Sequence, residues 1–160
     1  MTILERVEAM LLTHDIAPEH QGDDLTTYIS CGMVGCRMLI SHTKGMLRVY
    51  ITLPVYVPDY QRQAVAEAIA RINWSLHSGA MELDMTDGEL QFRNVLPVMD
   101  SEPTDEQIDW VLFWTWSLMG RYANALLDVI VGACEPETAI AKVEAPGLEM
   151  VSASRGGLPN

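Results

Sequence analysis

Apolar and polar residues alternate along two stretches of the chain, and this pattern predicts a β-sheet. Met46 to about Val55 carries apolar residues at every second position, with Arg48, Tyr50 and Thr52 between them. The stretch 79–95 alternates on both sides of Asp87-Gly88, a pair that favours a two-residue type I′ turn. We therefore expect the strongest strand at 46–55 and a β-hairpin at 79–95.

The two-residue turn would fix which residues face each other across the hairpin. The expected pairs are Met85–Leu90 and Leu83–Phe92 on one face, and Glu82–Arg93 and Asp84–Gln91 on the other. One face is apolar and the other is polar, so the hairpin needs a helix or a second sheet over its apolar side.

Two shorter strands precede the strongest one. Tyr28 to Cys31 and Cys36 to His42 are separated by a turn at 32–35, and a tight connection at 43–45 leads to the third strand. Three sequential strands with short turns predict an antiparallel meander.

Four stretches read as helices. Thr2 to about Thr13 begins with a capping box, and the polar segment 15–24 after it reads as a linker. A helix is expected from Pro58 to about His77. A long helix follows from Thr104 to about Val131, and a short one at 136–144.

These elements predict one α+β domain over residues 1–145, in the order α-βββ-α-ββ-α. The sheet would be five-stranded and mainly antiparallel, with helices packed on one face. Residues 146–160 end in Ser, Gly and Pro and are expected to form a flexible C-terminal tail.

Charge narrows the range of partners. The formal net charge is −12 and the pI about 4.5, which argues against a nucleic-acid partner and against anionic membrane surfaces. No apolar stretch approaches the length of a membrane span, and the N-terminus does not resemble a signal peptide. A cytoplasmic location without a membrane partner is expected.

No motif indicates a catalytic or metal site. The chain has three cysteines, Cys31, Cys36 and Cys134, an odd number whose spacing is not typical of disulfides. Cys31 and Cys36 are expected to be small buried thiols beside a turn. The histidines are spread over loops and element ends, and the acidic residues around the hairpin match no calcium loop. We expect no cofactor, no stoichiometric zinc and no enzymatic activity.

Aromatic residues cluster in the first half of the long helix. Its core stripe includes Ile108, Val111 and Leu112. Four aromatic residues fall outside that stripe: Trp110, Phe113, Trp114 and Trp116. Core packing would use one or two of them, whereas an interface would explain all four.

The whole arrangement resembles the YbjN-domain family. The resemblance is carried by the segment LRVYITLPVYVP at 47–58, by Asn73-Trp74 at the end of the following helix, and by the hairpin at 79–94. That family is similar in fold to the class I chaperones of type III secretion, which are small acidic dimers that bind unfolded effector segments. It also carries the description of a sensory transduction regulator, which implies no particular chemistry.

The resemblance and the aromatic cluster lead to two hypotheses. The first is a non-enzymatic, chaperone-like module that binds proteins or peptides and acts as a homodimer. The alternative is a regulatory domain that binds a small ligand between the sheet and the helices. An exposed apolar surface would favour the first, and a pocket with convergent polar groups would favour the second.

Overall fold

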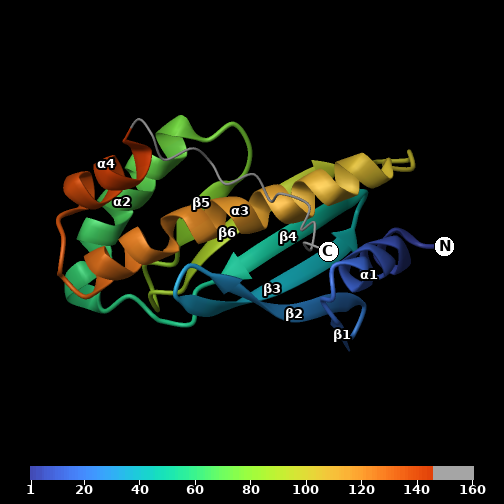
Figure 1. Cartoon of the computed structure of the whole chain (residues 1–160), viewed down its shortest axis with the longest axis horizontal. Coiled ribbons are helices and arrows are strands. Elements are labelled where there is room, and N and C mark those ends of the chain that lie inside the picture. The colour runs from blue at the N-terminus through green and yellow to red at the C-terminus, as the bar shows by residue number, and fades with distance from the viewer. Residues whose placement is uncertain (146–160) are drawn as a thin grey trace, which may run out of the picture.

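Six strands form one antiparallel sheet in the computed structural model, which describes residues 1–145 (Figure 1). The predicted flexible tail at 146–160 lies outside the described residues. The strands cross the sheet in the order β1-β2-β3-β4-β6-β5. They are β1 (Glu19–Gln21), β2 (Asp24–Cys31), β3 (Val34–Thr43), β4 (Met46–Thr52), β5 (Ala80–Leu83) and β6 (Leu90–Pro97).

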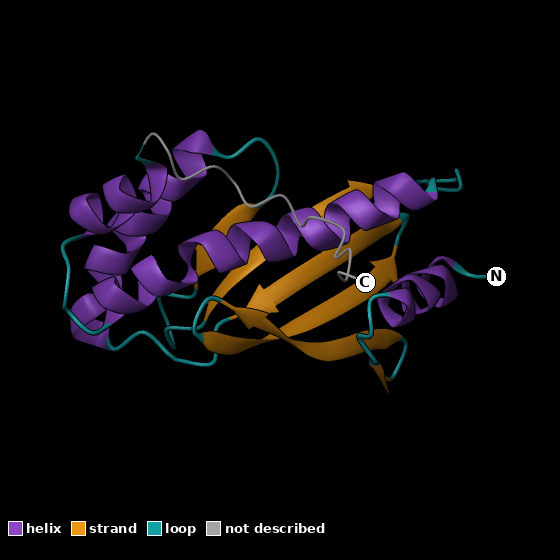
Figure 2. Ribbon diagram, viewed as in Figure 1, coloured by secondary structure: helices purple, strands orange, loops and turns teal. Residues whose placement is uncertain are grey.

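The described helices lie on one face of this sheet and around one of its ends (Figure 2). They are α1 (Ile3–Thr13), the short 3-10 helix η1 (Asp59–Gln61), α2 (Arg62–Ser75), α3 (Asp105–Ile130) and α4 (Pro136–Glu144). Capping boxes at Thr2 and Thr104 begin α1 and α3, as the sequence predicts. The mixed α+β class with an antiparallel sheet is therefore confirmed.

The prediction of five strands is wrong, because the polar linker contains a sixth. Glu19 pairs with Thr26 and Gln21 pairs with Asp24, which makes a hairpin with its turn at Gly22-Asp23. All three residues of β1 are exposed, so the strand has no apolar alternation from which it could be recognised. It is held by backbone pairing with β2, which begins at Asp24 rather than at Tyr28.

Because successive side chains of a strand point to opposite faces of the sheet, one set of side chains points into the core. Leu47, Val49 and Ile51 of β4 are fully buried, whereas Arg48 and Tyr50 between them lie half-exposed on the opposite face. No described helix covers that opposite face (Figure 2). The domain therefore has its core on one side of the sheet only.

The hairpin between β5 and β6 forms with a different register and turn from those predicted. Leu83 pairs with Leu90 and Met81 with Phe92, a shift of two residues that keeps the paired strand residues on their expected faces. Met85, expected to face Leu90 on the apolar side, lies in the loop after β5 and is exposed. Gly88 has a φ of +89°, but Asp87 is not in the left-handed region, so the turn is not type I′.

Contacts with residues outside the hairpin hold the loop between β5 and β6 in its observed conformation. The Val57 N–H donates to the Gly88 carbonyl at 2.8 Å, and Arg62 donates to the carbonyls of Met85 and Thr86 at 3.0 and 3.2 Å. The segment that leads into α2 thus holds the wider loop in place. The two-residue shift still leaves Glu82 paired diagonally with Arg93, whose Nε donates to it at 2.8 Å.

Side chains satisfy three backbone groups along the β5–β6 edge of the sheet. Asn73 at the end of α2 accepts from the Met81 N–H at 2.9 Å and donates to the Met81 carbonyl at 3.1 Å, so its amide acts as a further strand residue. Beyond β5, the Val95 N–H donates to its neighbour Asn94 at 2.9 Å, and Pro97 has no N–H to offer. The two backbone groups of Met81 and the N–H of Val95 thus have partners within the chain, which disfavours strand pairing with another chain at these residues.

We predict that Gly88→Val lowers the free energy of unfolding by at least about 1–3 kcal/mol. The φ of +89° resists a β-branched residue, and a Cβ at this position would lie 2.2 Å from the Val57 carbonyl oxygen. Urea denaturation measures the change. The control is Gly35→Ala, where no atom lies within 4 Å of the new Cβ. Equal midpoints for Gly88→Val and the natural chain would contradict the described loop.

Asn73→Ala should lower the free energy of unfolding by about 1–3 kcal/mol, because it leaves both backbone groups of Met81 without partners at a residue that is only 2% exposed. Hydrogen exchange should show faster opening of β5. The neighbouring Trp74, which is 92% exposed, supplies the control, because Trp74→Ala should change stability by less than about 0.5 kcal/mol. A larger loss for the tryptophan would contradict the proposed role of Asn73.

Candidate binding surface beside helix α3

Helix α3 is the longest element of the fold, and its core-facing side packs against β2, β4 and β6. Its fully buried residues include Ile108, Val111, Leu112 and Met119. The helix has two further flanks, one toward β2 and α1 and the other toward β6. The four aromatic residues singled out by the sequence divide between these flanks.

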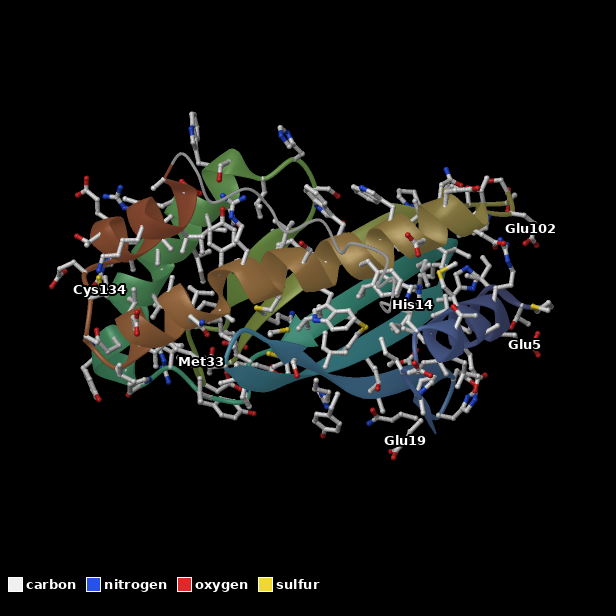
Figure 3. The ribbon with its side chains drawn as sticks, viewed as in Figure 1. Glu5, His14, Glu19, Met33, Glu102 and Cys134 are labelled. Carbon is white, nitrogen blue, oxygen red and sulfur yellow. The ribbon has the colours of Figure 1, made fainter. Side chains whose placement is uncertain are left out.

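The flank toward β2 carries Phe113 and Trp116, and the chain itself packs against both. The Trp116 indole N–H donates to the Ser30 carbonyl of β2 at 2.7 Å. The Phe113 ring lies 4.5 Å from the ring of His14, which stands where the end of α1 meets α3 (Figure 3). These two aromatic residues help to join α3 to its own domain.

Helix α1 therefore packs on its own sheet. Its buried residues are Ile3, Val7 and Leu11, and Arg6 forms ion pairs with Glu102 and Asp105 at the start of α3. Each described contact of α1 with α3 is on the Phe113 side.

The flank toward β6 carries the other two aromatic residues, Trp110 and Trp114. Their rings stack with centroids 6.0 Å apart and planes 14° apart. Trp110 remains 43% exposed, which is high for a large aromatic side chain. The two residues are one turn apart, so they form a continuous aromatic strip, here called the tryptophan strip, along this flank.

A pocket of about 370 Å³ adjoins the strip at Trp114. It is formed where three helices meet: the end of α2, the middle of α3 and the end of α4. Its lining consists of Ser75, Leu76, His77, Trp114, Leu118, Arg121, Tyr122 and Glu144. Only Trp114 was identified from the sequence, although Arg121 lies on the same flank two turns further along α3.

Hydrogen bonds occupy the acidic side of this pocket. The Tyr122 hydroxyl donates to the Glu144 carboxylate at 2.9 Å, and the Ser75 hydroxyl lies 2.9 Å from the same oxygen. Burial, followed by the bond to Glu144, raises the pKa of Tyr122 above its usual value, so the phenol stays protonated and remains a donor.

Two of the residues that line the pocket, Trp114 and Arg121, carry donors that are less well satisfied. The Trp114 Nε1 atom is buried and has no hydrogen-bond partner among residues 1–145. Arg121 stands 5.4 Å from the centroid of the Tyr122 ring and makes one long bond, 3.4 Å, to the Val143 carbonyl. No described carboxylate lies within ion-pair distance of Arg121.

The cysteines are separated into a buried pair and a distant third residue. Cys31 and Cys36 are fully buried on neighbouring strands, as the sequence predicts, while Cys134 lies in the connection between α3 and α4 (Figure 3). The hydrogen bond with Cys36 and burial both raise the pKa of Cys31. The same hydrogen bond lowers the pKa of Cys36. Neither side chain is accessible to solvent and both pack within the hydrophobic core, so the pair is part of the core.

The acidic residues around the hairpin have structural partners. The pKa of Glu82 is lowered by its hydrogen bonds with Arg93, and the pKa of Asp84 by the backbone N–H of Thr86. Within residues 1–145, no group of three His, Cys, Asp or Glu side chains is placed to hold a metal ion. None of the described helices combines the length and the apolar character needed to cross a membrane.

These observations define a class of protein: an α+β domain with one covered sheet face and a stacked tryptophan pair beside a pocket. The chain belongs to the YbjN family, whose model matches residues 4–128 and is described as "Putative bacterial sensory transduction regulator". That description is of a regulator and not of an enzyme.

A solved structure supports the fold. The chain is similar to "YbjN, a putative transcription regulator from E. coli", with a TM-score of 0.60 and 18% sequence identity. The match covers 82% of this chain and 91% of that one. No curated protein matches the chain. The likeness to type III secretion chaperones stays a prediction from the sequence.

Proposed function

We propose that this chain is a non-enzymatic, chaperone-like module that binds protein or peptide segments and acts as a homodimer. The observation that carries the proposal is the tryptophan strip, a stacked pair of large aromatic rings on the β6 flank of α3. Nucleic acid and membranes are not among the proposed partners, and a cytoplasmic location stays a prediction.

The energetic argument starts from the cost of leaving these rings in water. Each fully buried tryptophan or phenylalanine contributes a large apolar area, and aromatic side chains concentrate at the centres of protein interfaces. Phe113 and Trp116 already have neighbours in their own chain, so Trp110 and Trp114 are the pair that would gain most from a partner. Covering them with a second subunit or a bound segment removes this area from water.

The side-chain bonds at the β5–β6 edge of the sheet favour the flank of α3 over this edge as the surface for association. Asn73 occupies the backbone groups of Met81 in β5, and the Asn94 side chain occupies the Val95 N–H of β6. A partner strand would have to displace these bonds before it could pair. A side-chain contact on the tryptophan strip requires no such exchange.

A second candidate is a regulatory domain that binds a small ligand, and the pocket beside Trp114 supports it. Ligand sites are mostly apolar pockets with a few converging polar groups. Leu76, Leu118 and the Trp114 ring supply apolar wall, while Arg121 and Tyr122 supply polar groups. This candidate agrees with the family's description as a sensory transduction regulator.

Light scattering coupled to size exclusion tests the dimer at micromolar concentration. The natural chain should have twice the 17.8 kDa mass of one copy, and Trp110→Ser/Trp114→Ser should have the mass of one copy. Loss of two central aromatic anchors, each worth about 2 kcal/mol or more, would dissociate a micromolar dimer. Trp74→Ser, the same change at an exposed tryptophan of α2, should stay dimeric.

The dimer and its position are rejected by different results. A natural chain that elutes with a mass near 17.8 kDa would reject the homodimer. A double variant that remains dimeric would place the interface away from the tryptophan strip.

Client binding is tested by the aggregation of a chemically unfolded model client, reduced α-lactalbumin. An equimolar amount of the natural chain should slow the rise in turbidity severalfold, because the tryptophan strip offers apolar contact to unfolded segments. The double variant should lose most of this effect, and Trp74→Ser should keep it. If the natural chain leaves the turbidity unchanged, the chaperone-like role is rejected and the small-ligand candidate gains support.

A further inference from the structure

We propose that the uncovered face of the sheet, which is the face opposite α3, binds an extended acidic segment of a partner protein. This face lies on the other side of the sheet from the tryptophan strip. It would be a second interaction surface, independent of the homodimer and of the client binding proposed above. Its partner is indicated by the distribution of charge along the chain and by the register of β2, β3 and β4.

Acidic residues are missing from the strands that form the middle of this face. The chain has 22 of them among 160 residues, yet residues 25–58 contain none. This stretch forms almost all of β2 together with β3 and β4, which are neighbours in the sheet, and it carries Arg37, Lys44 and Arg48. In a protein with a net charge of −12, these strands therefore hold a local excess of positive charge.

The two arginines of this stretch point to the uncovered face. Arg37 pairs across the strands with Tyr28 and Thr52, and Arg48 pairs with Ser41. Because side chains alternate along a strand, these residues all lie on the side of the sheet opposite the core. Arg37 is exposed and Tyr28 is 76% exposed, so both are open to a partner.

Neither arginine is neutralised by a described residue of its own chain. No described carboxylate lies within ion-pair distance of Arg37 or Arg48. The described bonds of Arg48 go to neutral atoms, the Thr43 hydroxyl at 2.9 Å and the Met46 sulfur at 3.7 Å. A guanidinium with free donors can form charge-assisted, bidentate hydrogen bonds to a carboxylate.

The acidic residues of the uncovered face lie away from these arginines. Glu82 on β5 is bound by Arg93, whose Nε donates to it at 2.8 Å, so this pair is neutral. Glu19 on β1 and Asp24 at the start of β2 lie toward the opposite edge of the sheet. The unpaired positive charge is therefore in the middle of the sheet, on β3 and β4.

The strand register sets the spacing that a partner must match. Arg37 lies opposite Thr52, and Arg48 is four residues from Thr52 along β4, so the two arginines are about 13 Å apart in the strand direction. The paired Leu39 and Tyr50 lie between them. An extended segment has the same rise per residue and places alternate side chains on one side. Acidic side chains at positions i and i+4, with an apolar one at i+2, would meet both arginines and this pair.

An acidic polypeptide fits this face better than a nucleic acid does. Nucleic-acid affinity comes mainly from neutralising many phosphates at once. This face offers two unpaired arginines and the nearby Lys44, and the rest of a protein with a net charge of −12 repels a polyanion. Two carboxylates of a short segment need only the two arginines, and acidic groups beyond about 8 Å are largely screened at physiological salt.

The experiment measures peptide binding through the amide signals of the ¹⁵N-labelled full-length chain. The probe is acetyl-Thr-Glu-Thr-Phe-Thr-Glu-Thr-amide, which places both glutamates and the phenylalanine on one side when it is extended. The control peptide, acetyl-Thr-Thr-Glu-Phe-Glu-Thr-Thr-amide, has the same composition but places its glutamates opposite the phenylalanine. The probe should shift the signals of β3 and β4 in a saturable way. The control should bind at least about fivefold more weakly, because it cannot present its carboxylates and its ring together.

Variants separate charge recognition from folding. Arg37→Gln/Arg48→Gln should weaken binding of the probe at least about fivefold, the ratio expected for loss of two exposed ion pairs. Arg37→Lys/Arg48→Lys should restore part of the affinity, because the charges return. Arg71→Gln/Lys142→Gln removes the same number of charges from α2 and α4 and should bind like the natural chain. Added salt should weaken binding to the natural chain and have little effect on the first glutamine variant.

The outcomes distinguish the possible occupants of this face. Binding that depends on both the peptide register and the two arginines supports the proposal. Equal binding of the two peptides, or unchanged binding by Arg37→Gln/Arg48→Gln, would overturn it. Tighter binding of a single-stranded oligothymidylate would assign the face to nucleic acid, and a lower light-scattering mass for this variant would assign it to a second copy; each would also overturn the proposal. Trp110→Ser/Trp114→Ser should bind the probe like the natural chain, so failure of the tryptophan-strip proposal is distinguishable from failure of this one.

Discussion

One constraint governs this fold: a wide antiparallel sheet has one apolar face, and helices must cover that face without a second sheet to help. Helix α3 provides most of the cover, because it is long enough to pack against β2, β4 and β6 in a single pass. A single helix presents only one stripe to the sheet. The packing on its two remaining flanks then depends on what the neighbouring elements can supply.

The two flanks of α3 are covered unequally. On the β2 side, α1 folds back over the sheet and fixes Phe113 and Trp116 within the domain. On the β6 side, β5 pairs only with residues 90–93 and does not extend along the rest of β6. Asn73 and Asn94 satisfy backbone groups along this edge, but neither supplies apolar cover for α3. The exposed Trp110 is a direct result of this asymmetry.

The proposed binding surface therefore combines two kinds of structure. The tryptophan strip lies on a regular helix whose core-facing side is buried. The adjoining pocket lies where α2, α3 and α4 meet, so its polar groups come from parts of the chain that are far apart in sequence. The proposed role, a module that recognises another molecule without changing it chemically, rests on this aromatic surface and the pocket beside it. Family membership is compatible with this role, and the 18% identity to the solved relative extends only to the fold.

The sequence by itself determined the elements in which buried and exposed residues recur at regular intervals. The alternation at 46–55 and the two capping boxes correctly predict the existence of β4, α1 and α3, because each depends on neighbours within a few residues. Strand β4 ends at Thr52, three residues before the predicted end. It also indicated that Trp110 and Trp114 fall outside the core stripe. Strand β1 was not predicted, because its three residues are all exposed and show no alternation of buried and exposed positions.

The tertiary structure alone decided the features that depend on distant partners. Val57 and Arg62 hold the loop after β5, which replaces the predicted type I′ turn and shifts the hairpin register by two residues. The pocket could not be predicted for the same reason. Ser75, Arg121 and Glu144 have no common spacing in the sequence, and they meet only because three helix segments converge at one end of the sheet. Local pattern determines which segments form and which faces they bury, whereas the positions of polar groups from separate segments depend on how those segments pack.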